Sequence, residues 1–184
     1  MPPRAQLPPV TPMPRVLVAY SSKTRSTAEI AEAIADEIRR SGIEAVAADV
    51  HERPDARDFD AVVLGSALYI FRWRRGARAF ARRNARALLE RPLWMFSSGP
   101  FDRSAEEGEV PMVKGARRIF ERLHARGHKT FGGRAGSPRI QAALEKDGKP
   151  IDYRNFEQIR GWARGIAGDL RAPAGDTKRQ EAAA

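Results

Sequence analysis

The chain has 184 residues and no cysteine, and its 33 basic and 23 acidic side chains give a net charge of +10 at pH 7. A chain of this length favours one domain with a single sizeable core. The absence of cysteine excludes disulfides, thiol catalysis and cysteine-ligated iron–sulfur clusters, so any redox chemistry must come from a bound organic group.

The N-terminal segment and the charge indicate where the protein acts. Residues 1–14 are proline-rich and lack the apolar stretch of a secretory signal, and no run of about 18 apolar residues predicts a membrane span. We therefore expect a cytoplasmic protein without a transmembrane segment. The arginine-rich excess of basic residues reflects either compositional bias or attraction to an anionic surface or an acidic partner. We expect no nucleic-acid partner, and no zinc-like spacing is present.

Strand and helix patterns alternate over residues 15–171, between an arm at 1–14 and a tail at 172–184. Apolar runs predict strands at 16–20, 43–50, 59–65, 92–96 and 128–133. Helical periodicity predicts helices at 26–41, 76–90, 113–126 and 155–170. Gly42 and Gly127 are expected to end two helices, and Gly65 to end the third strand. The connection at 134–152 is polar, with one helical turn near 140–144.

This alternation predicts a doubly wound α/β fold, in which helices cover both faces of a mostly parallel sheet. In such sheets ligands bind beyond the carboxyl ends of the strands. Three predicted loops meet there, at 21–27, 66–73 and 97–100. We expect any ligand site to lie between these loops.

The first of these loops is rich in hydroxyl side chains. It supplies Ser21, Ser22, Thr24, Ser26 and Thr27, with Lys23 and Arg25 between them. Free N–H groups and the helix dipole favour an anion where a strand runs into a helix N-terminus. The loop has the glycine pattern of neither a P-loop nor a dinucleotide fold. It is therefore either a phosphate site of another kind or only a turn that caps the helix.

The other two loops carry groups that suit a flat ring. The second loop begins with Ser66, Ala67, Leu68 and Tyr69, and the third contains Ser97, Ser98 and Gly99. A planar ligand needs aromatic or apolar faces to stack on. Candidates near these loops are Tyr69, Phe71, Trp73 and Phe101. Backbone donors at 97–99 can bind a polar ring edge.

Several segments together resemble the flavodoxin-domain family that includes the menaquinone-dependent protoporphyrinogen oxidase. They are the loop at 20–27, the strand and loop at 59–69, the helix through Phe80, the strand and loop at 92–100, and the segment at 151–157. The resemblance implies a flavodoxin-like three-layer sandwich with five parallel strands in the order 2-1-3-4-5. It also implies FMN as the cofactor, with its phosphate at 21–27 and its ring between 66–69 and 97–99.

Two features depart from the family's pattern. Arg25 stands where the phosphate loop usually has glycine, and its guanidinium can add a charge-assisted bond to a phosphate. The segment at 134–150 is short and polar, whereas the oxidase has a longer and more apolar segment after its fifth strand. This second departure bears on access of a quinone or a membrane to the site.

The resemblance implies an oxidoreductase that passes electrons through FMN to a quinone or a similar acceptor. Four arginines lie near the second loop: Arg72, Arg74, Arg75 and Arg78. They either bind the carboxylates of a porphyrinogen or form a solvated helix face. Two other functions stay open: an FMN electron carrier between proteins, and a non-enzymatic interaction module of the same fold that has lost its flavin. The histidines His51, His124 and His128 are expected to have surface or packing roles.

Overall fold

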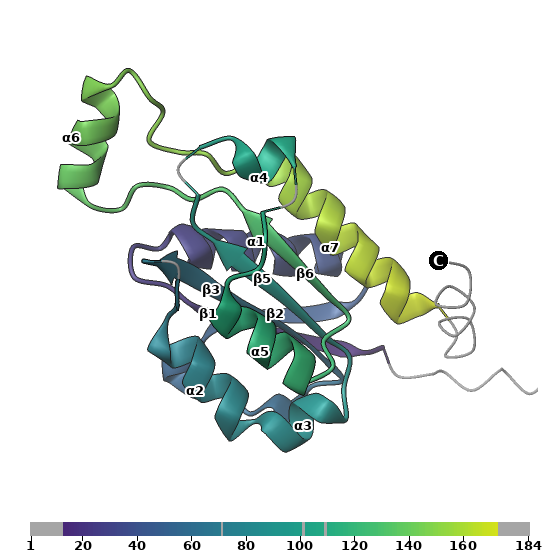
Figure 1. The fold of residues 1–184 in the computed structure, drawn as a ribbon. Coiled ribbons are helices and arrows are strands. Elements are labelled where there is room, and N and C mark those ends of the chain that lie inside the picture. Colours follow the sequence, from purple (N-terminus) through teal and green to yellow (C-terminus); the bar gives the residue numbers. More distant parts are fainter. Residues whose placement is uncertain (1–12, 71, 101, 109, 173–184) are drawn as a thin grey trace, which may run out of the picture.

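The protein is described by a computed structural model over residues 13–70, 72–100, 102–108 and 110–172. A central sheet contains five parallel strands in the order β2-β1-β3-β5-β6, as Figure 1 shows. Their bounds are β1 Arg15–Ser21, β2 Glu44–Asp49, β3 Ala61–Tyr69, β5 Leu93–Ser98 and β6 Gly127–Phe131. Counted among the parallel strands alone, this is the predicted order 2-1-3-4-5, which is confirmed.

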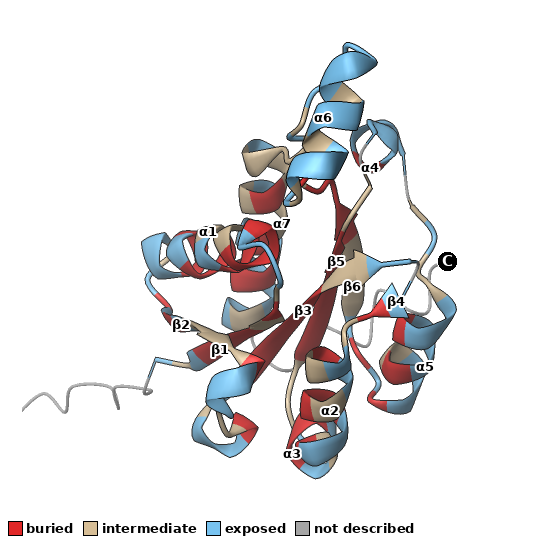
Figure 2. Ribbon diagram, turned by 90° about the vertical axis from the view of Figure 1, so that its left-hand side faces the viewer, coloured by how far each residue is buried: buried red, intermediate tan, exposed pale blue. Residues whose placement is uncertain are grey.

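Helices cover both faces of the sheet. One face carries α1 (Ser26–Arg40) and α7 (Phe156–Arg171), and the other carries α2 (Arg75–Arg83), α3 (Ala85–Leu89) and α5 (Lys114–Arg122) (Figure 1). Short helices lie in the connections: η1 (Val50–Glu52), η2 (Ala56–Asp58), α4 (Ser104–Glu107) and α6 (Pro138–Lys146). Figure 2 shows the buried strands β3 and β5 between the two helical layers, which makes the fold a three-layer sandwich.

The unbroken apolar run of the first strand explains why it lies at the centre. Val16 and Val18 point into the core beneath α1 and α7, whereas Leu17 and Ala19 point into the core beneath α2 and α5. All four side chains are fully buried. A strand buried on both faces needs apolar residues at every position, because successive side chains alternate between the faces.

The two long helices are fixed by their apolar faces and their ends. Ile30, Ile34 and Ile38 recur at helical spacing and are fully buried on α1. Gly42 follows this helix with a φ of 77°, a left-handed conformation that glycine adopts readily, as predicted. At the start of α7, the Asn155 side chain accepts a hydrogen bond of 3.0 Å from the Gln158 N–H.

The third strand does not stop at Gly65, so that prediction is wrong. A Cβ atom at Gly65 would lie 2.0 Å from the ring of Phe96 on the neighbouring strand, so glycine serves here to admit that ring. β3 continues to Tyr69 and pairs antiparallel with the two-residue strand β4 (Arg72–Trp73). The predicted loop at 66–73 is therefore mainly a hairpin.

Three further expectations are corrected. The helix predicted at 76–90 is divided at Asn84, whose buried amide accepts from the Ala56 N–H and donates to the Phe80 carbonyl. The helix predicted to run to residue 126 ends at Arg122, and Gly127 begins β6 instead of ending the helix. The connection at 134–152 holds the nine-residue helix α6 and not a single turn.

The predicted arm and tail lie almost wholly outside the described residues. Of these segments, only residues 13, 14 and 172 are described. Within the described ranges, no helix combines the length and the apolar character that crossing a membrane requires.

Candidate functional site

A cavity of about 440 Å³ opens at the carboxyl edge of the sheet. Parallel strands deliver four segments to its wall: the hydroxyl loop after β1, the end of β3, the turn after β5 and the segment after β6. Its size lies in the range of small-molecule and cofactor sites. The cavity is therefore where the strand topology predicts a ligand.

Most of the predicted site residues meet at this cavity. Those in its wall are Lys23, Thr24, Ser26, Thr27, Ala67, Leu68, Tyr69, Ser98 and Gly99. The predicted residues that do not line it are Ser21, Ser22, Arg25, Ser66 and Ser97. Ser66 instead holds the hairpin, because its hydroxyl accepts from the Arg74 N–H at 3.0 Å and donates to the Ala67 carbonyl.

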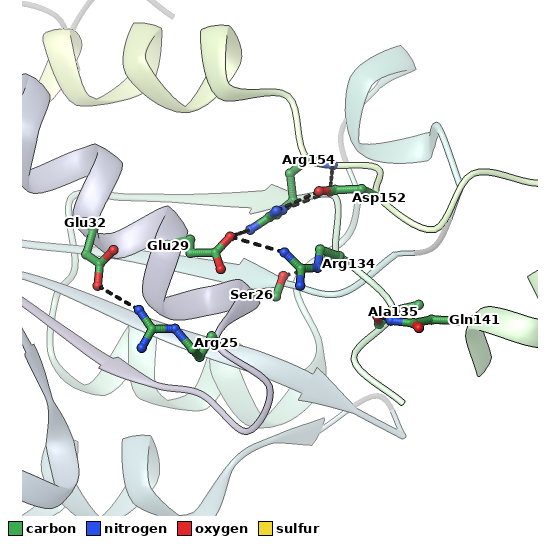
Figure 3. Close-up of polar contacts among 9 residues, drawn as sticks. All are labelled: Arg25, Ser26, Glu29, Glu32, Arg134, Ala135, Gln141, Asp152 and Arg154. Atoms are coloured by element: carbon green, nitrogen blue, oxygen red, sulfur yellow. Dashed lines mark hydrogen bonds and ion pairs between the residues drawn. The ribbon is translucent and has the colours of Figure 1, made fainter. Parts of the chain in front are cut away.

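Arg25 occupies the backbone conformation for which glycine is suited. Its φ is 63° and ψ is −16°, immediately before the first turn of α1. Its guanidinium extends along the helix to within 4.0 Å of the Glu32 carboxylate, and its side chain is 77% exposed. Figure 3 shows this side chain directed to Glu32, away from Arg134 at the cavity. In this arrangement the backbone of Arg25 shapes the loop, and its guanidinium is directed to Glu32 and does not line the cavity.

The hydroxyl loop contains buried polar atoms without partners. The Ser21, Ser22 and Thr27 hydroxyls are buried and have no hydrogen-bond partner among the described residues. The Ser26 hydroxyl accepts from the Arg134 N–H at 3.1 Å and can still donate its own proton. Buried polar groups are costly when unpaired. Ser26 and Thr27 line the cavity and fit a phosphate, whose oxygens accept hydrogen bonds from such hydroxyls.

The hairpin presents an exposed apolar tip beside the cavity. Tyr69 and Ile70 are 62% and 74% exposed, and the ammonium of Lys23 lies 5.8 Å from the centre of the Tyr69 ring. Phe71 and Phe101, which were also predicted as stacking faces, lie outside the described residues. Of the two predicted aromatic residues that the structure describes, Tyr69 lines the cavity and Trp73 does not.

Trp73 was expected to face the ligand, and this expectation is wrong. Its register opposite Leu68 turns the indole into the core, where it is 2% exposed. The indole N–H donates to the Ser97 hydroxyl at 2.8 Å, and His128 Nε2 lies 3.0 Å from the same oxygen. Burial lowers the pKa of His128 to about 4, so its ring is neutral at pH 7. Since the indole N–H is only a donor, the Ser97 hydroxyl can give its proton to the imidazole.

The turn after β5 lies close against the hairpin. A Cβ atom at Gly99 would lie 2.7 Å from the Leu68 Cβ, so a larger residue would push the two walls apart. The Gly99 N–H already donates to the Phe131 carbonyl at 3.2 Å. This N–H is therefore engaged in the protein and is not an unpaired donor for a ring edge.

Sequence reasoning missed the wall that follows β6. Its cavity residues include Gly133, Arg134, Gly136 and Ile140. A Cβ atom at Gly136 would lie 2.1 Å from the Thr24 Cβ, so this segment touches the hydroxyl loop directly. Glycines and a proline directly after a strand's carboxyl end were the available signal.

An ion cluster around the buried Arg154 side chain ties this wall to the start of α1, as Figure 3 shows. The Arg154 side chain is 4% exposed and contacts both Glu29 and Asp152, the latter at 2.6 Å. Arg134 lies 3.7 Å from the same Glu29 carboxylate. Burial raises the pKa of the Asp152 carboxyl, but hydrogen bonds from Arg154 outweigh this effect and hold the pKa below its usual value. The cluster closes the neck of residues 134–152 from which α6 projects.

Comparisons with known proteins agree with this geometry. The flavodoxin domain model matches residues 17–155. Protoporphyrinogen IX dehydrogenase [quinone] of Escherichia coli (strain K12) is 25% identical over 171 residues, which cover 83% of this chain and 94% of the relative.

Solved structures agree in fold. A flavodoxin from the domain Archaea superimposes with a TM-score of 0.58 and 12% identity over 85% of this chain and 99% of its own. The rubredoxin oxygen:oxidoreductase of Desulfovibrio gigas gives a TM-score of 0.60 with 15% identity over 87% of this chain and 37% of its own. Because the domain model matches well over half of the chain, this protein belongs to the flavodoxin domain family, and that membership supports FMN as its cofactor.

Proposed function

We propose that this protein is an FMN-dependent oxidoreductase that passes electrons between a small reduced substrate and a quinone or similar acceptor. The observation that carries the proposal is the cavity whose hydroxyl loop contains the buried Thr27 hydroxyl, which has no partner in the described part of the chain. Bound FMN supplies the electron-transfer chemistry, which no side chain of this cysteine-free chain provides. The protein binds the cofactor, orients it and controls access to it.

In this proposal the hydroxyl loop holds the phosphate. Thr24, Ser26 and Thr27 donate hydroxyl protons, and the first N–H groups of α1 add further donors. Lys23 contributes a positive charge at the mouth of the cavity. The left-handed backbone of Arg25 lies immediately before α1, where the loop turns into the helix.

The hairpin and the turn after β5 frame the ring. Tyr69 offers an aromatic face, and the apolar side chain of Leu68 lies close to Gly99 in the same wall. Arg74 also lines the cavity, and its Nε is buried without a partner among the described residues. It is therefore suited to bind a carboxylate of a substrate that approaches the ring.

The first experiment is a titration of the purified protein with FMN, followed by flavin fluorescence, with riboflavin as the matched ligand that lacks the phosphate. If the hydroxyl loop binds the phosphate, FMN should bind at least about a hundredfold more tightly than riboflavin, because several charge-assisted bonds are lost together. Equal affinities would contradict the phosphate site. No binding of FMN at micromolar concentration would contradict the redox function and favour an interaction module of the same fold.

The substrate and the acceptor are proposed from the Escherichia coli relative, which is named as a protoporphyrinogen IX dehydrogenase that uses quinone. A second hollow lies next to the cavity, and its four arginines suit a substrate with carboxylates. These arginines are Arg72, Arg74, Arg75 and Arg78. The test is oxidation of protoporphyrinogen IX by the FMN-loaded protein with menaquinone as acceptor. Turnover supports the oxidase, whereas a stable FMN complex without turnover favours an electron carrier between proteins.

A further inference from the structure

A groove of about 480 Å³ separates α2 from α5 on the face of the sheet opposite α1. Arginines form both of its walls: Arg75, Arg78 and Arg82 on α2, and Arg118 and Arg122 on α5. The rest of the lining consists of Ala79, Gly115 and Ile119. No acidic side chain lines the groove, so its charge is of one sign.

These arginines have no acidic partner in the part of the chain that the structure describes. Among the described residues, none of the five takes part in an ion pair. The only acidic residue in either helix is Glu121, which does not line the groove. Other surface arginines of this chain do form ion pairs, for example Arg15 with Glu44 and Arg164 with Glu157. The groove therefore gathers five arginines that form no ion pair with any described residue.

The arrangement works against the stability of α2. Arg75, Arg78 and Arg82 follow one another at spacings of three and four, so like charges lie side by side on one helix face. Arg75 also begins the helix, where the dipole disfavours a cation. Local rules of this kind tend to be broken where a surface has a function.

The groove leads to the mouth of the candidate FMN cavity. A second hollow shares Arg75 and Arg78 with the groove and shares Tyr69, Ile70 and Arg74 with the cavity. A partner seated in the groove would thus lie next to the exposed tip of the hairpin. Its position would bring it to the side of the protein where the cavity opens.

We propose that this groove docks an acidic protein through a protruding segment rich in aspartate or glutamate. The shape favours a protein over a membrane, because a flat bilayer reaches the rims of a recess but not its floor. None of the exposed large apolar side chains of the described residues lines the groove, so nothing there would enter the acyl region. The groove also lacks aromatic residues on which nucleic-acid bases stack.

The docking does not require FMN, so it can be tested separately from the redox function. The probe is a fluorescent helical peptide of about 20 residues with glutamate along one face, and the matched peptide has glutamine at the same positions. Binding is followed by fluorescence anisotropy at about 20 mM and about 300 mM salt, because screening grows strongly over that range. The acidic peptide should bind, the glutamine peptide should not, and high salt should weaken the complex.

Variants distinguish binding in the groove from a general effect of the protein's net charge. Replacing Arg75, Arg78 and Arg82 together with glutamine should weaken peptide binding by at least about tenfold, as should Arg118→Gln with Arg122→Gln on the other wall. The matched control replaces three exposed arginines on other elements with glutamine and removes the same charge; these are Arg53, Arg103 and Arg139. The control should stay within about twofold of the parent protein. Far-ultraviolet circular dichroism checks that each variant is folded.

Three results would overturn the proposal. One is that the groove variants and the control variant weaken peptide binding equally, which would mean that net charge alone causes the binding. Another is no difference between the acidic and the glutamine peptide. The third is groove-dependent binding of phosphatidylglycerol vesicles or a single-stranded oligonucleotide that exceeds binding of the peptide, which would replace the acidic protein with a membrane or a nucleic acid.

Discussion

The hydroxyl of Thr27 is buried in the cavity wall without a hydrogen-bond partner among the described residues. Thr27→Val replaces it with a methyl group of similar size. We expect the Kd for FMN to rise about tenfold, while the free energy of unfolding of the FMN-free protein is unchanged or rises by up to about 1 kcal/mol, because an unpaired buried polar group is removed. Fluorescence titration and urea denaturation measure the two quantities.

Thr130→Val is the control, because Thr130 is equally buried but lies on β6 outside the cavity. It should leave FMN affinity unchanged. If Thr27→Val bound FMN as tightly as the parent protein, the phosphate would not contact this hydroxyl.

His128 makes stability depend on pH in a defined direction. Burial lowers its pKa in the folded protein from 6.5 to about 4, so the unfolded chain binds more protons between these values. The free energy of unfolding is therefore highest above about pH 6.5, and it falls by up to about 3 kcal/mol as the pH falls to about 4. Urea denaturation between pH 4 and pH 7 measures this slope.

His128→Gln removes the titrating group but keeps a hydrogen-bond acceptor for the Ser97 hydroxyl. The variant should lose less stability than the parent protein on acidification over the same interval. Parallel pH curves for the two proteins would show that other groups cause the acid sensitivity.

At the scale of elements, the neck below α6 depends on one buried guanidinium. Arg154 is 4% exposed and joins Glu29 on α1 to Asp152 in the neck. Arg154→Met removes the charge-assisted hydrogen bonds to two partly exposed carboxylates, so we expect the free energy of unfolding to fall by about 1.5–3 kcal/mol. Amides of the neck that bond across it, such as those of Ala135 and Tyr153, should also lose protection against hydrogen exchange.

Arg164→Met provides the comparison, because Arg164 also contacts two carboxylates but its side chain is 50% exposed. Water and salt screen that pair, so its loss should cost less than about 1 kcal/mol. Similar losses for both variants would mean that burial does not govern the neck cluster.

On the arginine face of α2, we expect that replacing one arginine with glutamate stabilises the protein. Arg78→Glu removes like-charge neighbours and creates attraction to Arg75 and Arg82 at spacings of three and four. We expect the free energy of unfolding to rise by about 0.5–1 kcal/mol. Urea denaturation of the variant and of Arg53→Glu, a single exposed change outside this helix, makes the comparison. A destabilised Arg78→Glu variant would contradict the view that this helix sacrifices stability for its surface.

For the whole molecule, the net charge of +10 should govern encounters with charged reactants. After reduction of the FMN-loaded protein, oxidation by the anion ferricyanide should slow about tenfold as salt is raised, because attraction is screened. Oxidation by the cation hexaammineruthenium(III) should instead become faster. Stopped-flow absorbance measures both rates, and the same salt dependence for both reagents would contradict electrostatic steering.

The fold was largely predictable because each element carries its own periodic signal. The apolar run of β1 and the isoleucine face of α1 identify layers without knowledge of their neighbours. Once strands and helices alternate, right-handed connections restrict the topology and bring the loops at 21–27, 66–69 and 97–99 to one edge. For this reason the location of the candidate site could be predicted along with the sheet.

The errors arose where a neighbouring element decides the outcome. Gly65 has the appearance of a strand end, but the Phe96 ring requires it in mid-strand. Trp73 belongs to a ligand-facing segment in sequence, but its pairing with β3 turns it into the core. Such contacts depend on residues far apart in the chain, which local patterns do not report.

The amino-acid sequence by itself determined the alternating layers, the edge at which ligands bind and the charge of the molecule, because these follow from local periodicity and composition. Only the tertiary structure decided that Arg25 points to Glu32, that residues 133–140 complete the cavity wall, and that arginines of α2 and α5 face each other across a groove. The physical reason is that side-chain direction and groove shape are set by packing between elements, and this packing exists only after the sheet and its helices have assembled.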